Sequence, residues 1–595
     1  MSLLGSFVLA NNTGNFDALV MMKARLLQNI NNITLRRTAE GAVGVRALPT
    51  IADIEATHTI IPRNAYKPYV PVASQYLKVS QSAGNLHWNS TVSFSIGNMG
   101  EFLWDAFLNL QTNALTASST TLAAINSLNG DDYPYDLVNQ TASEAAQVGS
   151  TDQWTFVTSR YVDAAGNTYT AGDTVANYVY LANNPGHRLF VQHEFNVSSA
   201  PIDTYTTNTD TFYMNSRIMT QKMAAYKRCI GQEVPIPGYS NTLGDTAAGF
   251  EARQQIAVLN GPQTPKATQP ALTLNYPYKF DMCESPSSSV PILQIQGAPR
   301  EIKSTIGSAN TVVFTSSPIF LEQTLHTLTV TTGSITRDSA VTSLTSVPLP
   351  LSTVNTSSFF QSASVYINNI FIDQSIHDLY INRASFALTR LHLSYTQNIT
   401  TTAQRVQLST FKWAVEYVFI GMSDLTYATD PVLWDQFQGF NPRNFHDYRY
   451  TEVQSNMTLA SATVAPTSAL TDSSYTYYPS FDILQSLQVT LQTIDYIQNT
   501  GGFNVRFYDS YTPFRNGGPF ISGADLPGYC MLNFSFYPGG KNPYGYYNIS
   551  RAREFYLVPY CSSVPSVVAI STLAAEGVCL NFLYIALGNL NIRFN

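Results

Sequence analysis

The chain is divided by the stretch Asn260-Gly261-Pro262-Gln263-Thr264-Pro265-Lys266, a little before the middle of its 595 residues. Its two prolines, together with Pro270, fix φ and remove backbone donors, so neither a helix nor a central strand can run through it. Strand-like sequence lies on both sides. This arrangement predicts a stiff connector between two β-rich halves, each a barrel or a sandwich.

The composition favours an all-β protein. Only 12% of the residues are charged, whereas aromatic residues also reach 12%, with 36 Tyr and 32 Phe. Helices use charged residues to solvate an outer face, while Thr, Tyr, Phe and Val suit pleated strands. The chain is also too long for a single hydrophobic core. Because so few charges would leave a free monomer poorly soluble, we expect other subunits to cover much of the surface.

Charge and cysteine content narrow the classes of partner. The formal net charge is -7 and no basic tract is present, so we expect no direct nucleic-acid partner, since phosphate binding needs clustered Lys and Arg. The five cysteines form no Cys-x-x-Cys pair, which is typical of a reducing compartment and predicts no disulfide framework. Sequons such as Asn89, Asn196 and Asn548 leave open a glycosylated secreted protein, although a chain rich in Asn, Ser and Thr produces many by chance.

Neither a signal peptide nor a membrane helix is predicted. Residues 1–6 carry no positive charge, as a signal peptide would. Residues 555–575 are uncharged over a span that could cross a bilayer, but Pro559 and Pro565 interrupt it. The best helix is residues 15–31, where apolar residues recur every three to four positions, followed by a polar arm at residues 36–45.

The strand pattern predicts two similar units with long insertions. Short strands separated by turns fill each half, and residues 110–174 and 424–479 lack a core pattern, so we expect loop insertions there. The clearest strand is residues 411–420, whose alternate residues Phe411, Trp413, Val415, Tyr417 and Phe419 are expected on one face. A duplicated sandwich accounts for this better than one large sheet.

No catalytic or metal-binding motif is present, so we predict no enzyme activity, cofactor or metal. His187 and His193 are expected on one strand about 20 Å apart, too far for one metal ion, and are interpreted as surface residues. Asp131 and Asp132 are expected to cap a turn. The alternative function is a carbohydrate-binding or glycoside-hydrolase β-sandwich, which needs two facing carboxylates, but no pair stands out.

Six blocks in a common order resemble the major capsid proteins of African swine fever virus and its relatives among the nucleocytoplasmic large DNA viruses of amoebae. The block at residues 548–556 is the most specific, and the departures concentrate in the two insertions. The blocks are residues 67–72, 230–234, 260–266, 366–369, 412–421 and 548–556.

The resemblance implies two jelly rolls in tandem, each an eight-stranded β-sandwich, with a short N-terminal helix. On this basis we expect a base helix and arm, a first jelly roll, an inter-barrel linker and a second jelly roll. The corresponding residues are 1–45, 46–258, 259–270 and 271–595. Pro262 and Pro265 would stiffen the joint between the barrels. Arg551 and Arg553, alternating with Glu554 on a late strand, would form buried ion pairs between barrels or subunits, with an exposed strand face as the alternative.

The same resemblance implies a structural role in the virion. We expect a homotrimer that forms a pseudo-hexagonal capsomer of an icosahedral capsid. Neighbouring capsomers and minor capsid or cement proteins would be its partners. The N-terminal base would face an internal membrane, and assembly would take place in the host cytoplasm.

Overall fold

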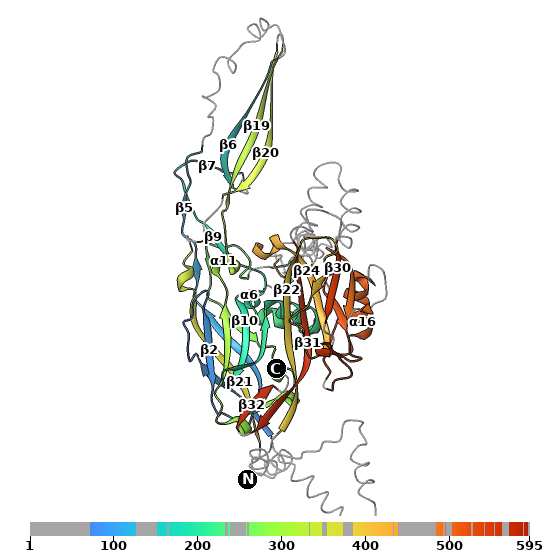
Figure 1. The fold of residues 1–595 in the computed structure, drawn as a ribbon. Coiled ribbons are helices and arrows are strands. Elements are labelled where there is room, and N and C mark those ends of the chain that lie inside the picture. Colours follow the sequence, from blue (N-terminus) through green and yellow to red (C-terminus); the bar gives the residue numbers. More distant parts are fainter. Residues whose placement is uncertain are drawn as a thin grey trace, which may run out of the picture.

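The computed structural model gives the protein an extended, two-lobed body with a narrow projection at one end (Figure 1). The expected helix at residues 15–31 and arm at residues 36–45 lie outside the described residues. The structure describes residues 72–125, 152–163, 166–232, 236–237, 257–258, 261–331, 334–347, 351, 354–372, 385–431, 434–437, 483–491, 494–495, 503–524, 528–540, 542–551, 554–561, 571–586 and 588–592.

The first lobe is a sandwich of two antiparallel sheets around one apolar core. One sheet has the order β1 (Val72–Ser80), β21 (Phe360–Ile372), β3 (Phe102–Thr112), β15 (Thr273–Pro277), with β16 (Val290–Pro291) also paired to β3. The other has the order β11 (Ala200–Thr206), β10 (Phe190–Val197), β17 (Arg300–Ile306), β2 (Thr91–Ile96).

The second lobe is a sandwich of the same kind with its own core. Its first sheet has the order β22 (Ser385–Ile399), β31 (Ser571–Ala586), β24 (Ala414–Asp424), β28 (Cys530–Asn533), with β29 (Tyr547–Asn548) and β32 (Asn589–Ile592) off this path. Its second sheet has the order β23 (Val406–Gln407), β30 (Phe555–Cys561), β25 (Leu484–Leu491), β26 (Ile494–Asp495), with β27 (Phe503–Asn504) paired to β25.

The two sandwiches share one strand order. Each sandwich has eight strands on the main hydrogen-bonded paths of its two sheets. When these eight are numbered along the chain, one sheet always joins the first, eighth, third and sixth, and the other joins the second, seventh, fourth and fifth. This is the jelly-roll order, in which strands far apart in sequence pair. The predicted all-β fold of two tandem jelly rolls is therefore confirmed.

The boundary expected between the jelly rolls is wrong. Four strands that follow residues 259–270, namely β15, β16, β17 and β21, belong to the sheets of the first sandwich. The proline-rich stretch belongs to the insertion between the fifth and sixth strands, and the chain passes to the second sandwich only between β21 and β22. A jelly roll brings its last strands back beside its first, so a proline-rich loop inside one unit resembles a linker in the sequence.

Pro262 and Pro265 consequently do not stiffen a joint between barrels. The stretch runs along β9 (Tyr178–Leu181), where the Leu181 N–H donates to the carbonyl of Pro262 at 2.8 Å. Val179 and Lys266 exchange two further backbone hydrogen bonds. The prolines therefore shape a segment packed on the first sandwich.

The projection is a separate sheet of long strands (Figure 1). Its order is β20 (Ser334–Ser346), β19 (Ile319–Thr331), β6 (Asp152–Asp163), β7 (Thr168–Tyr169). The insertion expected as a loop at residues 110–174 supplies β6 and β7, whereas the β19–β20 hairpin was not predicted from the sequence. Most of the second expected insertion, residues 438–479 of 424–479, lies outside the described residues.

Helices occupy the insertions between the fifth and sixth strands of both sandwiches. In the first sandwich these are α7 (Thr207–Arg217) and α8 (Thr220–Cys229), where the sequence predicted only strands. In the second they are the π-helical turn η8 (Phe507–Tyr511) and α16 (Thr512–Asn516). The short remaining elements that position the site are α6 (Pro185–Arg188), α10 (Asp281–Glu284), η5 (Leu425–Thr429) and η9 (Ile549–Arg551).

The strand expected at residues 411–420 is present but begins at Ala414 and does not keep one face. A β-bulge at Glu416 interrupts its pairing with β31 between Val415 and Tyr417. Val415 and Val418 therefore face the core of the second sandwich, while Tyr417 and Phe419 face the opposite side. A bulge adds one residue and reverses the alternation, which a period-two pattern cannot reveal.

Candidate functional site at the interface between the sandwiches

The first sheet of the second sandwich is buried on both faces. One face lies on its own core, and the other is covered by Phe212, which α7 of the first sandwich inserts. The Phe212 ring stacks 4.7 Å from Phe437 and 5.6 Å from Phe419, with Tyr529 edge-on at 5.9 Å. We call this contact, with the polar groups around it, the inter-sandwich interface.

Helix α7 is anchored on the other side by the first sandwich. Its Met214 lies in the first core, and its Asp210 carboxylate accepts hydrogen bonds from the Tyr276 hydroxyl at 2.6 and 2.7 Å. The buried Lys279 ammonium lies 3.8 Å from Asp210. Burial raises the pKa of Asp210 to about 6, although Lys279 opposes the shift. The helix thus places Met214 in the core of the first sandwich and Phe212 against the outer face of the second sandwich.

Asp203 and His392 connect the two sandwiches directly. Asp203 lies on the edge strand β11 and His392 on the edge strand β22. The carboxylate accepts from the His392 backbone N–H and lies beside Nδ1, each at 2.9 Å. Burial lowers the pKa of His392, but the Asp203 carboxylate more than offsets this and the pKa is raised above 6.5. The protonated imidazole is therefore favoured at the interface.

Glu576, on β31, gathers hydroxyl groups from both sandwiches. Thr209 of α7 donates to its carboxylate at 2.9 Å, Thr206 donates at 3.2 Å, and Ser394 of β22 also donates. Burial raises the pKa of Glu576 to about 7, although these hydroxyls oppose the shift. Beside it lies a cavity of about 20 Å³, lined by residues that include Tyr213, Arg217 and His392, with room for one water molecule.

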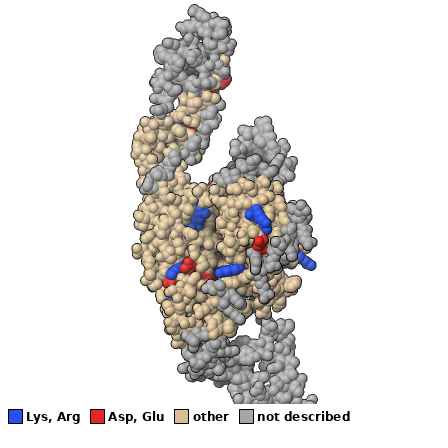
Figure 2. Space-filling model, in the orientation of Figure 1, with Lys and Arg blue, Asp and Glu red and all other residues tan. Residues whose placement is uncertain are grey.

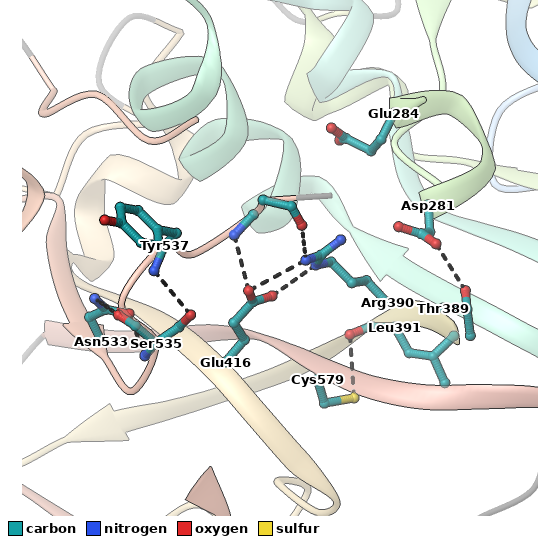
Figure 3. A network of polar contacts seen from close by, with 12 residues as sticks. Asp281, Glu284, Thr389, Arg390, Leu391, Glu416, Asn533, Ser535, Tyr537 and Cys579 are labelled. Atoms are coloured by element: carbon teal, nitrogen blue, oxygen red, sulfur yellow. Dashed lines mark hydrogen bonds and ion pairs between the residues drawn. The ribbon is translucent and has the colours of Figure 1, made fainter. Parts of the chain in front are cut away.

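An arginine–glutamate pair fixes the bulge in β24 (Figure 3). The Arg390 Nε donates to Glu416 at 2.8 Å, and the guanidinium also donates to the carbonyl of Gly540. The Gly539 N–H donates to the same carboxylate at 3.3 Å. Burial lowers the pKa of Arg390, but Glu416 more than offsets this and the pKa is raised. The pair ties β22 and β24 to the loop after β28, just beside the interface.

Further links join the sandwiches at either side of this centre. Asp281 of α10 accepts from Thr389 of β22 at 3.3 Å (Figure 3), and burial raises the pKa of Asp281 to about 6. Asn184 donates to Asp435 at 2.6 Å, and the Arg188 guanidinium lies 4.6 Å from the centre of the Trp434 ring. Buried polar groups of both sandwiches therefore find partners across the interface.

The interpretation of His187 and His193 as surface residues is wrong, because both are fully buried. His187 lies on α6, where Nε2 is 2.8 Å from the Tyr226 hydroxyl. His193 lies on β10, where Nδ1 is 2.9 Å from the Ser304 hydroxyl. Burial lowers the pKa of both well below 6.5, so both are neutral. They are packing residues of the first core.

The expected charged strand near the C-terminus is only partly described. Residues 549–551 form the helical turn η9, and β30 begins at Phe555, so Arg551 and Glu554 do not alternate on one strand. Arg553 lies outside the described residues. Ion pairs of these three residues stay a prediction.

Sequence reasoning missed the interface residues Asp203, His392 and Glu576, and the neighbouring pair Arg390 and Glu416. Each lies inside a strand of a charge-poor chain, with Arg390 and His392 both on β22. Charged or titratable residues within such strands are the one signal that could have indicated them. Figure 2 shows how few charged residues the described surface carries on the face in view. Their partners come from strands or helices remote in sequence, so no local pattern pairs them.

Neither metal binding nor membrane crossing has support within the described ranges. There, no three His, Cys, Asp or Glu side chains are grouped to hold a metal ion. No helix among those residues combines the length and apolarity needed to cross a bilayer.

Two jelly rolls with one strand order, joined side by side through a buried interface, define a double jelly-roll protein. The chain is 26% identical to the major capsid protein of African swine fever virus, and the match covers 99% of each chain. It also matches the structure of the Faustovirus major capsid protein, with 25% identity and a TM-score of 0.67 over 96% of this chain and 99% of that one. The resemblance noted in the sequence is thereby confirmed over the whole chain.

A more distant structure shares the fold. The PBCV-1 virus capsid protein matches with 13% identity and a TM-score of 0.52, over 90% of this chain and 99% of that one. No family model matches the chain.

Proposed function

We propose that this protein is a major capsid protein, three copies of which form a pseudo-hexagonal capsomer in the icosahedral shell of a large DNA virus. The inter-sandwich interface is the observation that carries the proposal. It holds two similar sandwiches side by side as one block, so three chains present six similar units, as a hexagonal tile requires. Full-length similarity to capsid proteins supports the same function.

The structure of the interface suits a rigid capsid subunit. Aromatic packing around Phe212 and the buried bonds of Asp203 and Glu576 oppose rotation of one sandwich against the other. Domains joined through small polar contacts normally move relative to each other, whereas this interface is apolar at its centre, with Asp203 and Glu576 hydrogen-bonded across it. The role is structural, without catalysis.

The partners and the place of assembly belong to the same proposal. Neighbouring capsomers and minor capsid or cement proteins would contact the trimer, and residues 1–45 would form a base near an internal membrane. Assembly in the host cytoplasm is supported by the cysteines, since all five are free thiols and reducing compartments keep thiols free.

Electron microscopy of the purified protein tests this function. Hexagonal outlines with a three-fold set of projections are expected, because each chain carries one projecting sheet. Particles with a single two-lobed body would contradict the capsomer.

A further inference from the structure

The two helical insertions occupy equivalent places in their sandwiches, but one presents a buried aromatic side chain and the other an exposed one. Each follows the fifth strand of its sandwich and precedes the sixth, so α7 of the first corresponds to η8 and α16 of the second. Phe212 of α7 is 1% exposed because it packs on the second sandwich. Phe514 of α16 is 83% exposed.

Phe514 belongs to a larger aromatic surface. Phe503, Phe507 and Tyr511 stack in a row, with ring centres 4.3 and 5.5 Å apart. Tyr511 lies three residues before Phe514 on the continuous helix formed by η8 and α16, so the two side chains share one face. Tyr511 is 51% exposed. We call Phe503, Phe507, Tyr511 and Phe514 the aromatic surface.

This surface cannot be covered by the first sandwich of its own chain. In Figure 1, α16 lies on the edge of the second sandwich that faces away from the first. Exposed apolar patches of this kind mark interaction sites.

A matching surface lies on the first sandwich. The sheet covered by Phe212 in the second sandwich has the order β22-β31-β24-β28, and its equivalent in the first is β1-β21-β3-β15. The outer face of that equivalent sheet carries Tyr76, Phe107 and Tyr366, with neighbouring ring centres 5.7 and 5.1 Å apart. Tyr76 is 45% exposed.

The two sheets also share a construction. The third strand of each contains a bulge at an acidic residue, Asp105 in β3 and Glu416 in β24. Each acid bonds to the first strand of its own sheet, Asp105 with the Tyr76 hydroxyl and Glu416 with Arg390. One of these equivalent outer faces is covered within the chain, and the other carries exposed rings.

We infer that the aromatic surface of one copy packs on the outer face of β1-β21-β3-β15 of the next copy, repeating between chains the contact that α7 makes within the chain. The inference rests on the proposed trimer and states which surfaces form it. Such a contact joins two different surfaces and closes into a ring when the rotation per copy fits. First and second sandwiches would then alternate around the capsomer through similar contacts.

Substitution of the exposed phenylalanine tests the aromatic surface in the full chain. Phe514→Glu is expected to convert the trimer into monomers. These monomers should remain folded, because the Phe514 side chain is solvated in the single chain. Phe386→Glu is the matched control, since Phe386 is 58% exposed on β22, outside the aromatic surface. A Phe514→Glu protein that stays fully trimeric would overturn the inference.

Photocrosslinking tests the opposite surface. With p-benzoylphenylalanine at position 514 of the otherwise native trimer, adducts are expected on peptides of another copy that contain residues 72–80, 102–112 or 360–372. Adducts confined to other regions would overturn the assigned contact. A wild-type protein that is monomeric would overturn the proposed function itself, whereas a wild-type trimer with misplaced adducts would overturn only this inference.

Discussion

Asp203 and His392 lie on the edge strands of different sandwiches, and one carboxylate joins them by accepting the His392 backbone N–H and contacting its ring nitrogen, both at 2.9 Å. Both side chains are less than 10% exposed. A carboxylate that satisfies an edge-strand N–H also keeps that edge from pairing with another chain. The two sandwiches therefore meet without merging their sheets.

Replacing Asp203 with Asn is expected to destabilise the protein by about 3–5 kcal/mol, because a charged partner would remain buried without its counterpart. The melting temperature in a calorimeter measures the loss. Asp338→Asn is the control, since Asp338 is exposed on β20 of the projecting sheet. Equal melting temperatures for the two variants would show that the bond to His392 contributes nothing.

The interface predicts lower stability at higher pH. Glu576, with a pKa raised to about 7, holds a proton in the folded state that the unfolded chain releases near its ordinary pKa of 4.5. His392, with a pKa raised above 6.5, loses its stabilising proton as the pH rises through that higher value. Each unit of pKa difference corresponds to about 1.4 kcal/mol. The contribution of Glu576 and His392 to stability should therefore fall between about pH 5 and pH 8, whereas the buried neutral His187 and His193 act in the opposite direction below pH 6.5.

Glu576→Gln isolates the glutamate contribution to this pH dependence. Because glutamine does not titrate, the decline in melting temperature below pH 7 should become shallower. The contribution of His392 above pH 6.5 should remain. An unchanged slope across the whole range would rule Glu576 out as its source.

Removing the Phe212 ring should loosen one sandwich against the other. Phe212→Ala leaves a cavity between Phe419 and Phe437, and such truncations cost about 3–5 kcal/mol. Small-angle scattering should then show a broader distribution of interatomic distances, since the apolar centre of the interface is lost. Phe386→Ala, at an exposed position, should leave both the melting temperature and the scattering curve unchanged.

Arg390 and Glu416 should behave as one coupled unit. Arg390→Met and Glu416→Gln are each expected to lower stability by about 3–5 kcal/mol, because each leaves a buried charge unpaired. The double variant should lose less than the sum of the two, with a coupling energy of about 1–3 kcal/mol. Strict additivity in the double-mutant cycle would mean that the ion pair makes no net contribution.

The sequence predicted the fold class because strand composition and family blocks are spread along the whole chain. The boundary predicted at residues 259–270 was wrong, because jelly-roll strands pair across long separations in sequence. No local pattern in β15, β17 or β21 shows which sheet the strand joins. The sequence also could not show the bulge at Glu416, since one inserted residue reverses every later side chain. The contacts of the interface could not be predicted for the same reason, since Asp203 and His392 are 189 positions apart in the sequence.

Solution mass by size-exclusion chromatography with light scattering tests the central claim most directly. A capsomer of three chains of 65.5 kDa predicts a single species of about 196 kDa. A stable species of 65.5 kDa at micromolar concentration would contradict the account, because the exposed aromatic surface would then need no second copy.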